Sequence, residues 1–241
     1  MKKLLIILSL VMVAGACISA PRKARRRLQL AASGAFSPLD LDPVSWWRGE
    51  DNALDTASTN NGAWAGTETY ADGICGRAFS FVGSSVVKIG NPEELQDITT
   101  CTLVAWSNSD TFSNYQAIFG AGPLSNGAEA IGMYANSTSW NVQTRVLAEI
   151  QVTSYAHSSD TGNWHHLVMV KTALKQEIWV DGVLRDTEVP AAAETPNRPW
   201  GIGATFPRGW RFYFDGLIDE VMYFNKALTE PEIKQIYNWR E

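Results

Sequence analysis

Residues 162–185 constrain the fold of this chain more than any other stretch. In residues 164–171 apolar side chains occur at both odd and even positions, and successive side chains of an extended strand point to opposite faces. Residues 177–180 continue the extended pattern, and Asp181 and Gly182 then supply the positive-φ pair that a two-residue hairpin turn requires. A strand with apolar side chains on both faces needs a covering layer on each side. The pattern therefore predicts a packed two-sheet domain.

The first 27 residues differ in composition from the rest of the chain. A charged start at residues 1–3 and a 13-residue apolar run at residues 4–16 are typical of a secretory signal. The run is short for a membrane span, which needs about 20 residues. We predict that residues 1–20 are a signal peptide or signal anchor. Residues 21–43, basic at first and then containing proline and serine, are predicted to be a linker.

The sequence does not decide whether the N-terminal segment is cleaved, lipidated or retained. Small residues before Cys17 satisfy the cleavage rule and resemble the lipobox of bacterial lipoproteins, in which Cys17 would carry the lipid, although Ala14 stands where that pattern usually has Leu. The basic run at residues 22–27 hinders export, so a retained anchor and a mis-assigned start codon are the alternatives. Our expectation is an exported protein, secreted or at the cell surface, that meets a membrane only through this segment.

The charge of the remaining chain excludes one class of partner. The first 27 residues contain seven of the 20 Lys and Arg residues and none of the 25 Asp and Glu residues, which leaves a net charge of about −12 for residues 28–241. Such a domain repels phosphate backbones and anionic membranes, so we expect no nucleic-acid partner.

The cysteines allow two arrangements. If Cys17 leaves with the signal or carries a lipid, Cys75 and Cys101 remain. An even number in an exported domain is compatible with one disulfide bond between them, and two buried free thiols are the competing interpretation.

Short extended patterns recur along the rest of the chain at the spacing of a sandwich or barrel. One helix is predicted near the C-terminus, because Thr229 and Glu232 form a capping box before an apolar stripe of Ile233, Ile236 and Tyr237. We expect this helix to cover one edge or end of the sandwich. The predicted fold class is all-β, with two antiparallel sheets and a short C-terminal helix.

Four stretches carry motifs: Trp-Trp-Arg-Gly-Glu, Gly-x-x-Gly-x-Ala-Phe-Ser-Phe, Trp-His-His with Val-Asp-Gly, and Gly-Leu-Ile-Asp-Glu-Val. Together they resemble the laminin-G-like, concanavalin A-like lectin/glucanase superfamily, in the version common in secreted bacterial proteins. The resemblance implies a two-sheet antiparallel jelly roll for a domain at residues 44–241. One departure is Val82, which stands where the family often has Asp. The stretches are residues 44–50, 73–81, 164–170 with 179–182, and 216–233.

The resemblance also implies a cofactor. Many members hold one structural Ca²⁺ near the start and end of the sandwich, and Asp219 is the residue carried over as a ligand. Ca²⁺ takes six to eight oxygen ligands, and the loop at residues 49–55 offers Glu50 and Asp55 as further ligands. The alternative is that Asp219 caps a loop or pairs with Arg or Lys.

Catalysis is not expected. Glucanases of the wider superfamily need two carboxylates close together on one strand face, in a Glu-x-Asp-x-x-Glu pattern that this sequence lacks. Asp219 and Glu220 are neighbours, so strand alternation predicts that they face opposite ways. The same alternation separates His165 from His166, for which we expect structural roles.

Aromatic residues carry the binding hypothesis. Of the ten Trp residues, four lie in strand patterns and are expected in the core: Trp46, Trp106, Trp164 and Trp179. Three others follow Gly-, Ser-, Asn- or Pro-rich loops. We predict a non-catalytic extracellular recognition module that binds carbohydrate through such residues. The alternative is a protein–protein or adhesive scaffold domain of a cell-surface or virion-associated assembly, so the expected partner is a glycan or a surface protein. The predicted ligand-binding residues are Trp140, Trp200 and Trp210.

Overall fold

A computed structural model describes residues 36–112, 115–122, 130–146, 149–157, 160–191, 199–205 and 211–239. The chain divides into two units, residues 1–42 and 43–241. In the first unit, Ser37 caps a short 3₁₀ helix, η1 (Pro38–Leu41). The predicted signal at residues 1–20 and the lipidation site Cys17 lie outside the described residues. No helix in the described ranges combines the length and hydrophobicity that a membrane crossing requires.

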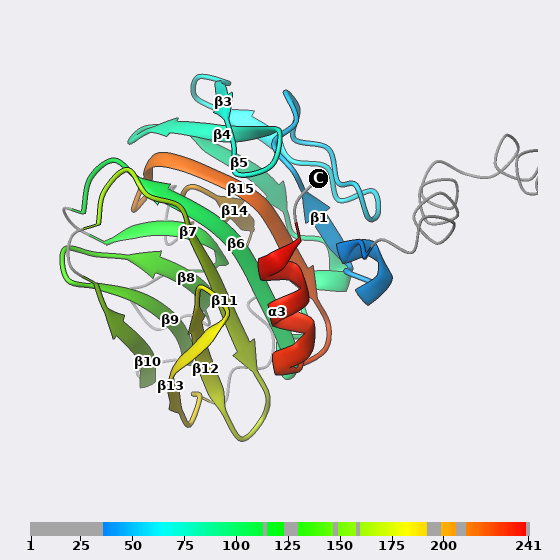
Figure 1. The fold of residues 1–241 in the computed structure, drawn as a ribbon, viewed down its shortest axis with the longest axis vertical. Helices are drawn as coiled ribbons and strands as arrows, with labels where there is room; N and C mark the ends of the chain where they lie inside the picture. The colour runs from blue at the N-terminus through cyan, green and yellow to red at the C-terminus, as the bar shows by residue number, and fades with distance from the viewer. Residues whose placement is uncertain are drawn as a thin grey trace, which may run out of the picture. The chain divides into compact units, whose positions relative to one another are not determined.

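The second unit is a sandwich of two antiparallel sheets (Figure 1). This arrangement confirms the predicted fold class, a two-sheet jelly roll with one C-terminal helix. The eight-stranded sheet has the order β13-β12-β11-β6-β15-β4-β3, with β1 also paired to β15, and the seven-stranded sheet has the order β10-β9-β8-β7-β14-β5-β2. The strands of the eight-stranded sheet are β1 (Ser45–Trp47), β3 (Tyr70–Asp72), β4 (Arg77–Val82), β6 (Cys101–Ser109), β11 (His165–Lys171), β12 (Gln176–Val180), β13 (Val183–Glu188) and β15 (Asp215–Phe224). Those of the seven-stranded sheet are β2 (Ala63–Ala65), β5 (Val86–Gly90), β7 (Gln116–Ala121), β8 (Ala130–Ala135), β9 (Ser139–Val146), β10 (Glu149–Ala156) and β14 (Trp200–Ile202).

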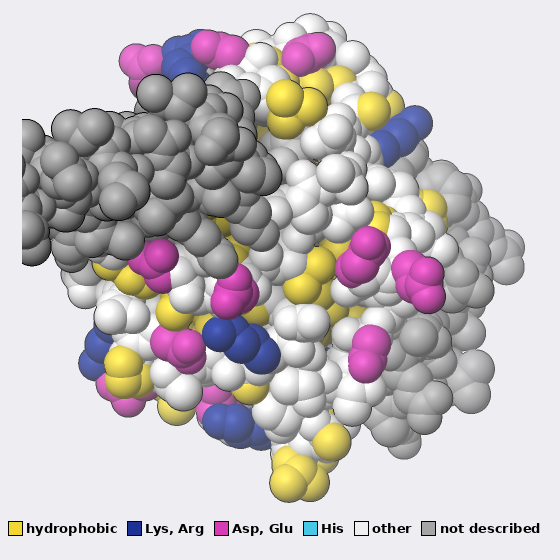
Figure 2. All heavy atoms as spheres, turned by 90° about the vertical axis from the view of Figure 1, so that its right-hand side faces the viewer, with side chains coloured by type: hydrophobic (Ala, Val, Ile, Leu, Met, Phe, Trp, Pro, Cys, Tyr) yellow, Lys and Arg dark blue, Asp and Glu magenta, His cyan; other side chains and the backbone are white. Residues whose placement is uncertain are grey.

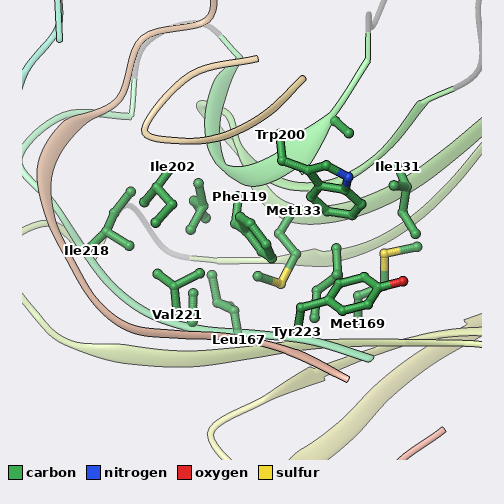
Figure 3. Close-up of a cluster of buried hydrophobic side chains, with 14 of the residues drawn as sticks. Phe119, Ile131, Met133, Leu167, Met169, Trp200, Ile202, Ile218, Val221 and Tyr223 are labelled. Atoms are coloured by element: carbon green, nitrogen blue, oxygen red, sulfur yellow. The ribbon is translucent and has the colours of Figure 1, made fainter. Parts of the chain in front are cut away.

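The hydrophobic core lies between the inner faces of the two sheets (Figure 3). Phe119, Met133 and Trp200 of the seven-stranded sheet face Leu167 and Tyr223 of the eight-stranded sheet. These side chains are all buried, and their alternation with outward residues fixes which face of each strand meets the core. A short 3₁₀ helix, η2 (Glu93–Leu95), adds Leu95 to the same cluster.

The central strand β11 is buried on both faces, as its sequence predicts. Its inward residues join the core, and its outward residues His166 and Val168 are also fully buried. Helix α3 (Glu230–Asn238) lies over the outer face of the eight-stranded sheet (Figure 1), where the ring of Tyr237 stacks on Trp106 with centroids 5.6 Å apart. The predicted capping box is present, because the Glu232 carboxylate accepts a hydrogen bond from the Thr229 backbone N–H at 2.7 Å.

The described side chains form no patch of one charge on the face shown in Figure 2. Acidic and basic groups are interspersed there with small hydrophobic groups. A nucleic-acid interface needs clustered Lys and Arg, and no such cluster is visible among the coloured side chains of that face.

Replacing Trp200 by Ala tests the core. Trp200 is fully buried, and its ring lies 5.2 Å from that of Phe119 and 5.3 Å from that of Tyr223. We expect Trp200→Ala to lower the free energy of unfolding by about 3–5 kcal/mol, because the lost contacts leave a cavity. The matched control is Leu174→Ala in the β11–β12 hairpin. Because the Leu174 side chain is 84% exposed, this substitution should change the free energy of unfolding by no more than about 0.5 kcal/mol. Urea unfolding measures both, and equal effects would contradict the assignment of Trp200 to the core.

Candidate functional site

Two of the three tryptophans predicted to contact ligand are part of the interior. The expectation that Trp140 and Trp200 stand at the surface is wrong, since their exposed fractions are 1% and 0%. The residues before Trp140 form a tight turn, in which Asn136 Oδ1 accepts hydrogen bonds from the backbone N–H groups of Thr138 and Ser139. The turn starts β9, and strand alternation then directs Trp140 inward. Trp210 lies outside the described residues and stays a prediction.

A row of glycines crosses the outer face of the seven-stranded sheet. Phe119 on β7, Trp200 on β14 and Met133 on β8 point into the core. Successive residues of a strand point to opposite faces, so the residues after Phe119 and Trp200 and the residue before Met133 point outward. These outward positions are all glycine, and the strand register aligns them side by side with Gln143 at one end and Lys88 at the other. We call Gly201, Gly120 and Gly132 the glycine row.

Tyr134 lies against the glycine row. It lies two residues after Gly132 on the same face of β8, and its ring folds back over that glycine: a Cβ atom on Gly132 would lie 2.8 Å from Tyr134 Oη. Burial raises the pKa of Tyr134, which is 1% exposed. Thr205 lies beside the phenol, yet neither Tyr134 Oη nor Thr205 Oγ1 makes a hydrogen bond of normal geometry to a described residue. Two buried hydroxyls therefore lie next to each other beside the glycine row.

Strand β9 adds two carboxamides to this face. Asn141 and Gln143 alternate with the inward Trp140 and Val142, so both point outward, and both are only 3% exposed. Ser139 holds Asn141 in place, because its Oγ donates to Asn141 Oδ1 at 3.2 Å and its carbonyl oxygen accepts from Asn141 Nδ2 at 3.0 Å. No hydrogen bond joins the Gln143 carboxamide to a described residue. Amide and hydroxyl groups without partners are the donors and acceptors that a hydroxyl-rich ligand can satisfy.

The sequence patterns used above did not identify this face, although the sequence contains a signal for it. Each glycine of the row stands between two apolar residues that face the core: Phe119 and Ala121, Ile131 and Met133, Trp200 and Ile202. A glycine inside a strand pattern marks a position where something approaches the backbone closely.

The three predicted calcium ligands are not gathered in one place. The carboxylate of Asp55 closes its own loop, since it accepts hydrogen bonds from the backbone N–H groups of Trp46 and Ala57 and from Ser58 Oγ. Asp219 and Glu50 instead flank the loop between β3 and β4, where side-chain-free Gly73 and Gly76 leave room for them. Within the described ranges, no three His, Cys, Asp or Glu residues are arranged to hold a metal ion.

Asp219 and Glu220 face the same side of β15, which corrects the expectation that they face opposite ways. A bulge separates Asp219 from Met222, and Glu220 has a φ of 51°, in the left-handed region. Because Ile218 and Val221 both join the core, the two carboxylates both lie on the outer face of the eight-stranded sheet. Asp219 accepts hydrogen bonds from the backbone N–H groups of Ile74, Cys75 and Glu220.

A guanidinium occupies the space between the other carboxylates. Arg48 Nε lies 3.1 Å from Glu220 Oε1, and Arg48 Nη2 lies 3.2 Å from Glu50 Oε1. The Trp46 indole N–H also donates to Glu220. A Ca²⁺ ion needs six to eight oxygen atoms that no hydrogen-bond donor or cation already occupies, so these residues do not fit the expected metal.

The two cysteines are free thiols at different places in the fold, so the alternative of a Cys75–Cys101 disulfide is wrong. Cys75 lies in the loop between β3 and β4, with its Sγ 4.0 Å from Arg48 Nη2. Cys101 begins β6 within the core, and burial raises its pKa to about 12. Such a thiol stays protonated and unreactive.

The two adjacent histidines are directed to different partners, as alternation predicts. His165 Nδ1 lies 2.9 Å from Asp181 Oδ2, in the hairpin turn after β12. His166 points to the opposite face, where its ring contacts Trp106 and Tyr237. The outward ring thus belongs to the packing of α3 on the sheet.

The fold and the glycine row together define the class of this protein: a jelly-roll sandwich with a hydroxyl- and amide-lined face on one sheet. A family model described as the concanavalin A-like lectin/glucanases superfamily matches residues 81–234. The chain belongs to this family. Comparison with curated protein sequences gives no match.

Several solved structures share the fold. Domain 4 of AbnA, an extracellular GH43 arabinanase from Geobacillus stearothermophilus, in complex with arabinotriose, has a TM-score of 0.68 and 17% identity, over 82% of this chain and 98% of that one. The ligand-binding domain of botulinum neurotoxin serotype D in complex with N-acetylneuraminic acid has a TM-score of 0.60 and 13% identity, over 83% of this chain. The binding domain of Paraclostridial Mosquitocidal Protein 1 has a TM-score of 0.65 and 13% identity, also over 83%. The chain spans about half the length of the two toxin domains, 52% of each.

The buried ionisable groups predict how stability depends on pH. Burial, and next the neighbouring Glu220, raise the pKa of Asp219 to about 8, and the hydrogen bond with Asp181 is the main cause that raises the pKa of His165. A group whose pKa is higher in the folded state stabilises the fold at low pH and loses that contribution as pH rises through the folded pKa. We therefore expect a higher melting temperature at pH 5.5 than at pH 8.5.

Two variants separate the contributions to this pH dependence. Asp219→Asn should flatten the slope between pH 5.5 and 8.5 while lowering the melting temperature overall, because its NH₂ group cannot accept the backbone N–H bonds. Asp110→Asn, at an exposed position, should leave the slope unchanged. Thermal melts followed by circular dichroism measure both, and a wild-type melting temperature that rises between pH 5.5 and 8.5 would contradict the raised pKa values.

Proposed function

We propose that this protein is a non-catalytic carbohydrate-binding domain and that the glycine row, with Tyr134, Asn141, Gln143 and Thr205 beside it, is its ligand-binding face. One observation carries the proposal: the hydroxyls of Tyr134 and Thr205 are buried on this face without a hydrogen bond of normal geometry to a described residue. Buried polar groups in native proteins nearly always have partners, and an unpaired one costs about 1–3 kcal/mol. Sugar hydroxyls supply such partners.

The shape of the face favours an extended ligand. Neighbouring strands lie about 4.8 Å apart, so the three glycines cover roughly 10 Å in the direction perpendicular to the strands. The three glycines contribute no side chains to this line, while the Tyr134 ring lies over Gly132 and the β9 carboxamides stand at its end. A linear oligosaccharide that crosses the strands along the glycine row fits this arrangement. The arabinanase domain of the same fold was solved with such a ligand, arabinotriose, which supports the ligand class.

The absence of acidic residues from these strands argues for binding rather than hydrolysis. Glycoside hydrolysis needs a pair of carboxyl groups about 5–9 Å apart at the scissile bond. Strands β7, β8, β9 and β14 contain no Asp or Glu. The carboxylate pair of Asp219 and Glu220 lies on the outer face of the other sheet and is fully buried. Secretion of the domain stays a prediction from residues 1–20.

Glycan-array screening followed by titration calorimetry tests this function. The probes are linear arabino-, xylo- and gluco-oligosaccharides, with sialylated glycans included in the array. We expect at least one linear oligosaccharide to bind, and Tyr134→Phe and Gln143→Ala each to weaken that binding by about tenfold, because each removes one or two hydrogen-bonding groups worth about 1–3 kcal/mol.

The matched control is Tyr155→Phe. Tyr155 lies on β10 of the same sheet but faces the core side, so the loss of its hydroxyl should leave the dissociation constant unchanged within about twofold. A folded wild-type protein that binds no glycan would contradict the proposal and favour the protein–protein or adhesive module. Binding that survives both Tyr134→Phe and Gln143→Ala would place the glycan site elsewhere on the chain.

A further inference from the structure

The first strand, the last strand and the C-terminal helix meet at one positively charged side chain. Arg48 directly follows β1, its Nε hydrogen bonds to Glu220 of β15, and its guanidinium carbon lies 5.9 Å from the ring centroid of Trp239, the C-cap residue of α3. Arg48 and Glu220 are 172 residues apart in the sequence. One side chain thus bridges the start and the end of the sandwich.

The surroundings of Arg48 suit a guanidinium. Its planar group lies 5.1 Å from the ring centroid of Trp46 and faces Trp239 as well, so two indoles contribute cation–π attraction. The side chain of Arg48 is 10% exposed and that of Glu220 is 1% exposed. Arginine is weakly hydrated and has five donors in a fixed fork, which makes it suited to a buried ion pair between aromatic rings.

We propose that the Arg48 guanidinium is the structural cation of this sandwich, and that it fulfils the role for which the resemblance to the family predicts Ca²⁺. Both would neutralise carboxylates where the first and last strands meet, but the guanidinium is covalently part of the chain. The fold is then independent of divalent metal. This inference does not depend on the proposed carbohydrate-binding function, because Arg48 and the glycine row are on different sheets.

The contacts of the carboxylates distinguish the two cations. A Ca²⁺ site presents oxygen atoms to the ion, whereas here the Asp219 oxygens accept three backbone N–H groups and the Glu220 oxygens accept from Trp46 and Arg48. The indoles of Trp46 and Trp239 have no oxygen to offer. The site therefore favours a cation that donates hydrogen bonds and stacks on rings over one that needs an oxygen cage.

Thermal melting of the full chain tests the inference in two arms. In the first arm, the melting temperature of the wild type should be the same within about 1 °C in 5 mM CaCl₂ and in 5 mM EGTA. A bound Ca²⁺ ion would raise the melting temperature, because a ligand that binds only the folded state stabilises it. A melting temperature that falls in EGTA would overturn the proposal.

The second arm uses substitutions of Arg48. Arg48→Gln should lower the melting temperature by about 10 °C, because it leaves the Glu220 carboxylate buried without its cation. Arg48→Lys keeps the positive charge but loses the planar array of donors, so it should lower the melting temperature less. This variant also keeps the test possible if Arg48→Gln does not fold. The matched control is Arg77→Gln. The ion pairs of Arg77 with Asp51 and Asp72 are at the surface, so their loss should lower the melting temperature by about 2 °C or less.

A double variant separates charge from packing. If Arg48 acts as a cation, Arg48→Gln combined with Glu220→Gln should melt at a higher temperature than Arg48→Gln alone, because no uncompensated carboxylate remains buried. Additive losses in the double variant would show that Arg48 contributes only packing and would overturn the proposal. Equal melting temperatures of Arg48→Gln and Arg77→Gln would overturn it as well.

Discussion

The alternation of side chains across paired strands is the constraint on which the rest of this structure depends. It sends one set of apolar residues from each sheet into a shared core and leaves each sheet with an outer face. On the eight-stranded sheet, the outer residues Trp106 and His166 are large and are covered by Tyr237 of α3. On the seven-stranded sheet, the middle of the outer face is glycine. The two outer faces therefore differ: one holds the ends of the chain together, and the other is the face that we propose for ligand binding.

Local sequence patterns were enough to predict the fold class. Strand β11 is apolar at every position from Leu167 to Val170, and the two-residue turn at Asp181 and Gly182 follows its partner strand, so a doubly covered hairpin could be inferred without knowing what covers it. The helix after Thr229 could be predicted for the same reason, because a capping box acts over four residues. In each case the determining interactions lie within one element or between neighbours in the sequence.

The sites depend on contacts that a linear pattern does not contain. Turn-forming residues before Trp140 suggested an exposed loop, but they only start a strand whose register decides where the ring points. The positive φ of Glu220 breaks the alternation that predicted opposite directions for the two carboxylates. The glycine row exists only because β14 inserts between β5 and β7, which aligns Gly201 with Gly120, 81 residues earlier in the chain. Such alignments follow from sheet topology, and topology is set by the whole core.

The distribution of charge follows from this division between the two faces. The domain carries a large excess of acidic residues, yet the four strands that form the glycine row and its neighbours contain none. The buried acids are concentrated on the other sheet, where Arg48 and backbone N–H groups compensate them. A carboxylate beside the glycine row would lose its hydration when a ligand excluded water, and that desolvation would oppose binding. Neutral amides and hydroxyls avoid this cost, because they carry no charge to desolvate and can hydrogen bond to the hydroxyls of a sugar. The face that we propose for ligand binding is thus on a different sheet from the ionic contacts that join the ends of the sandwich.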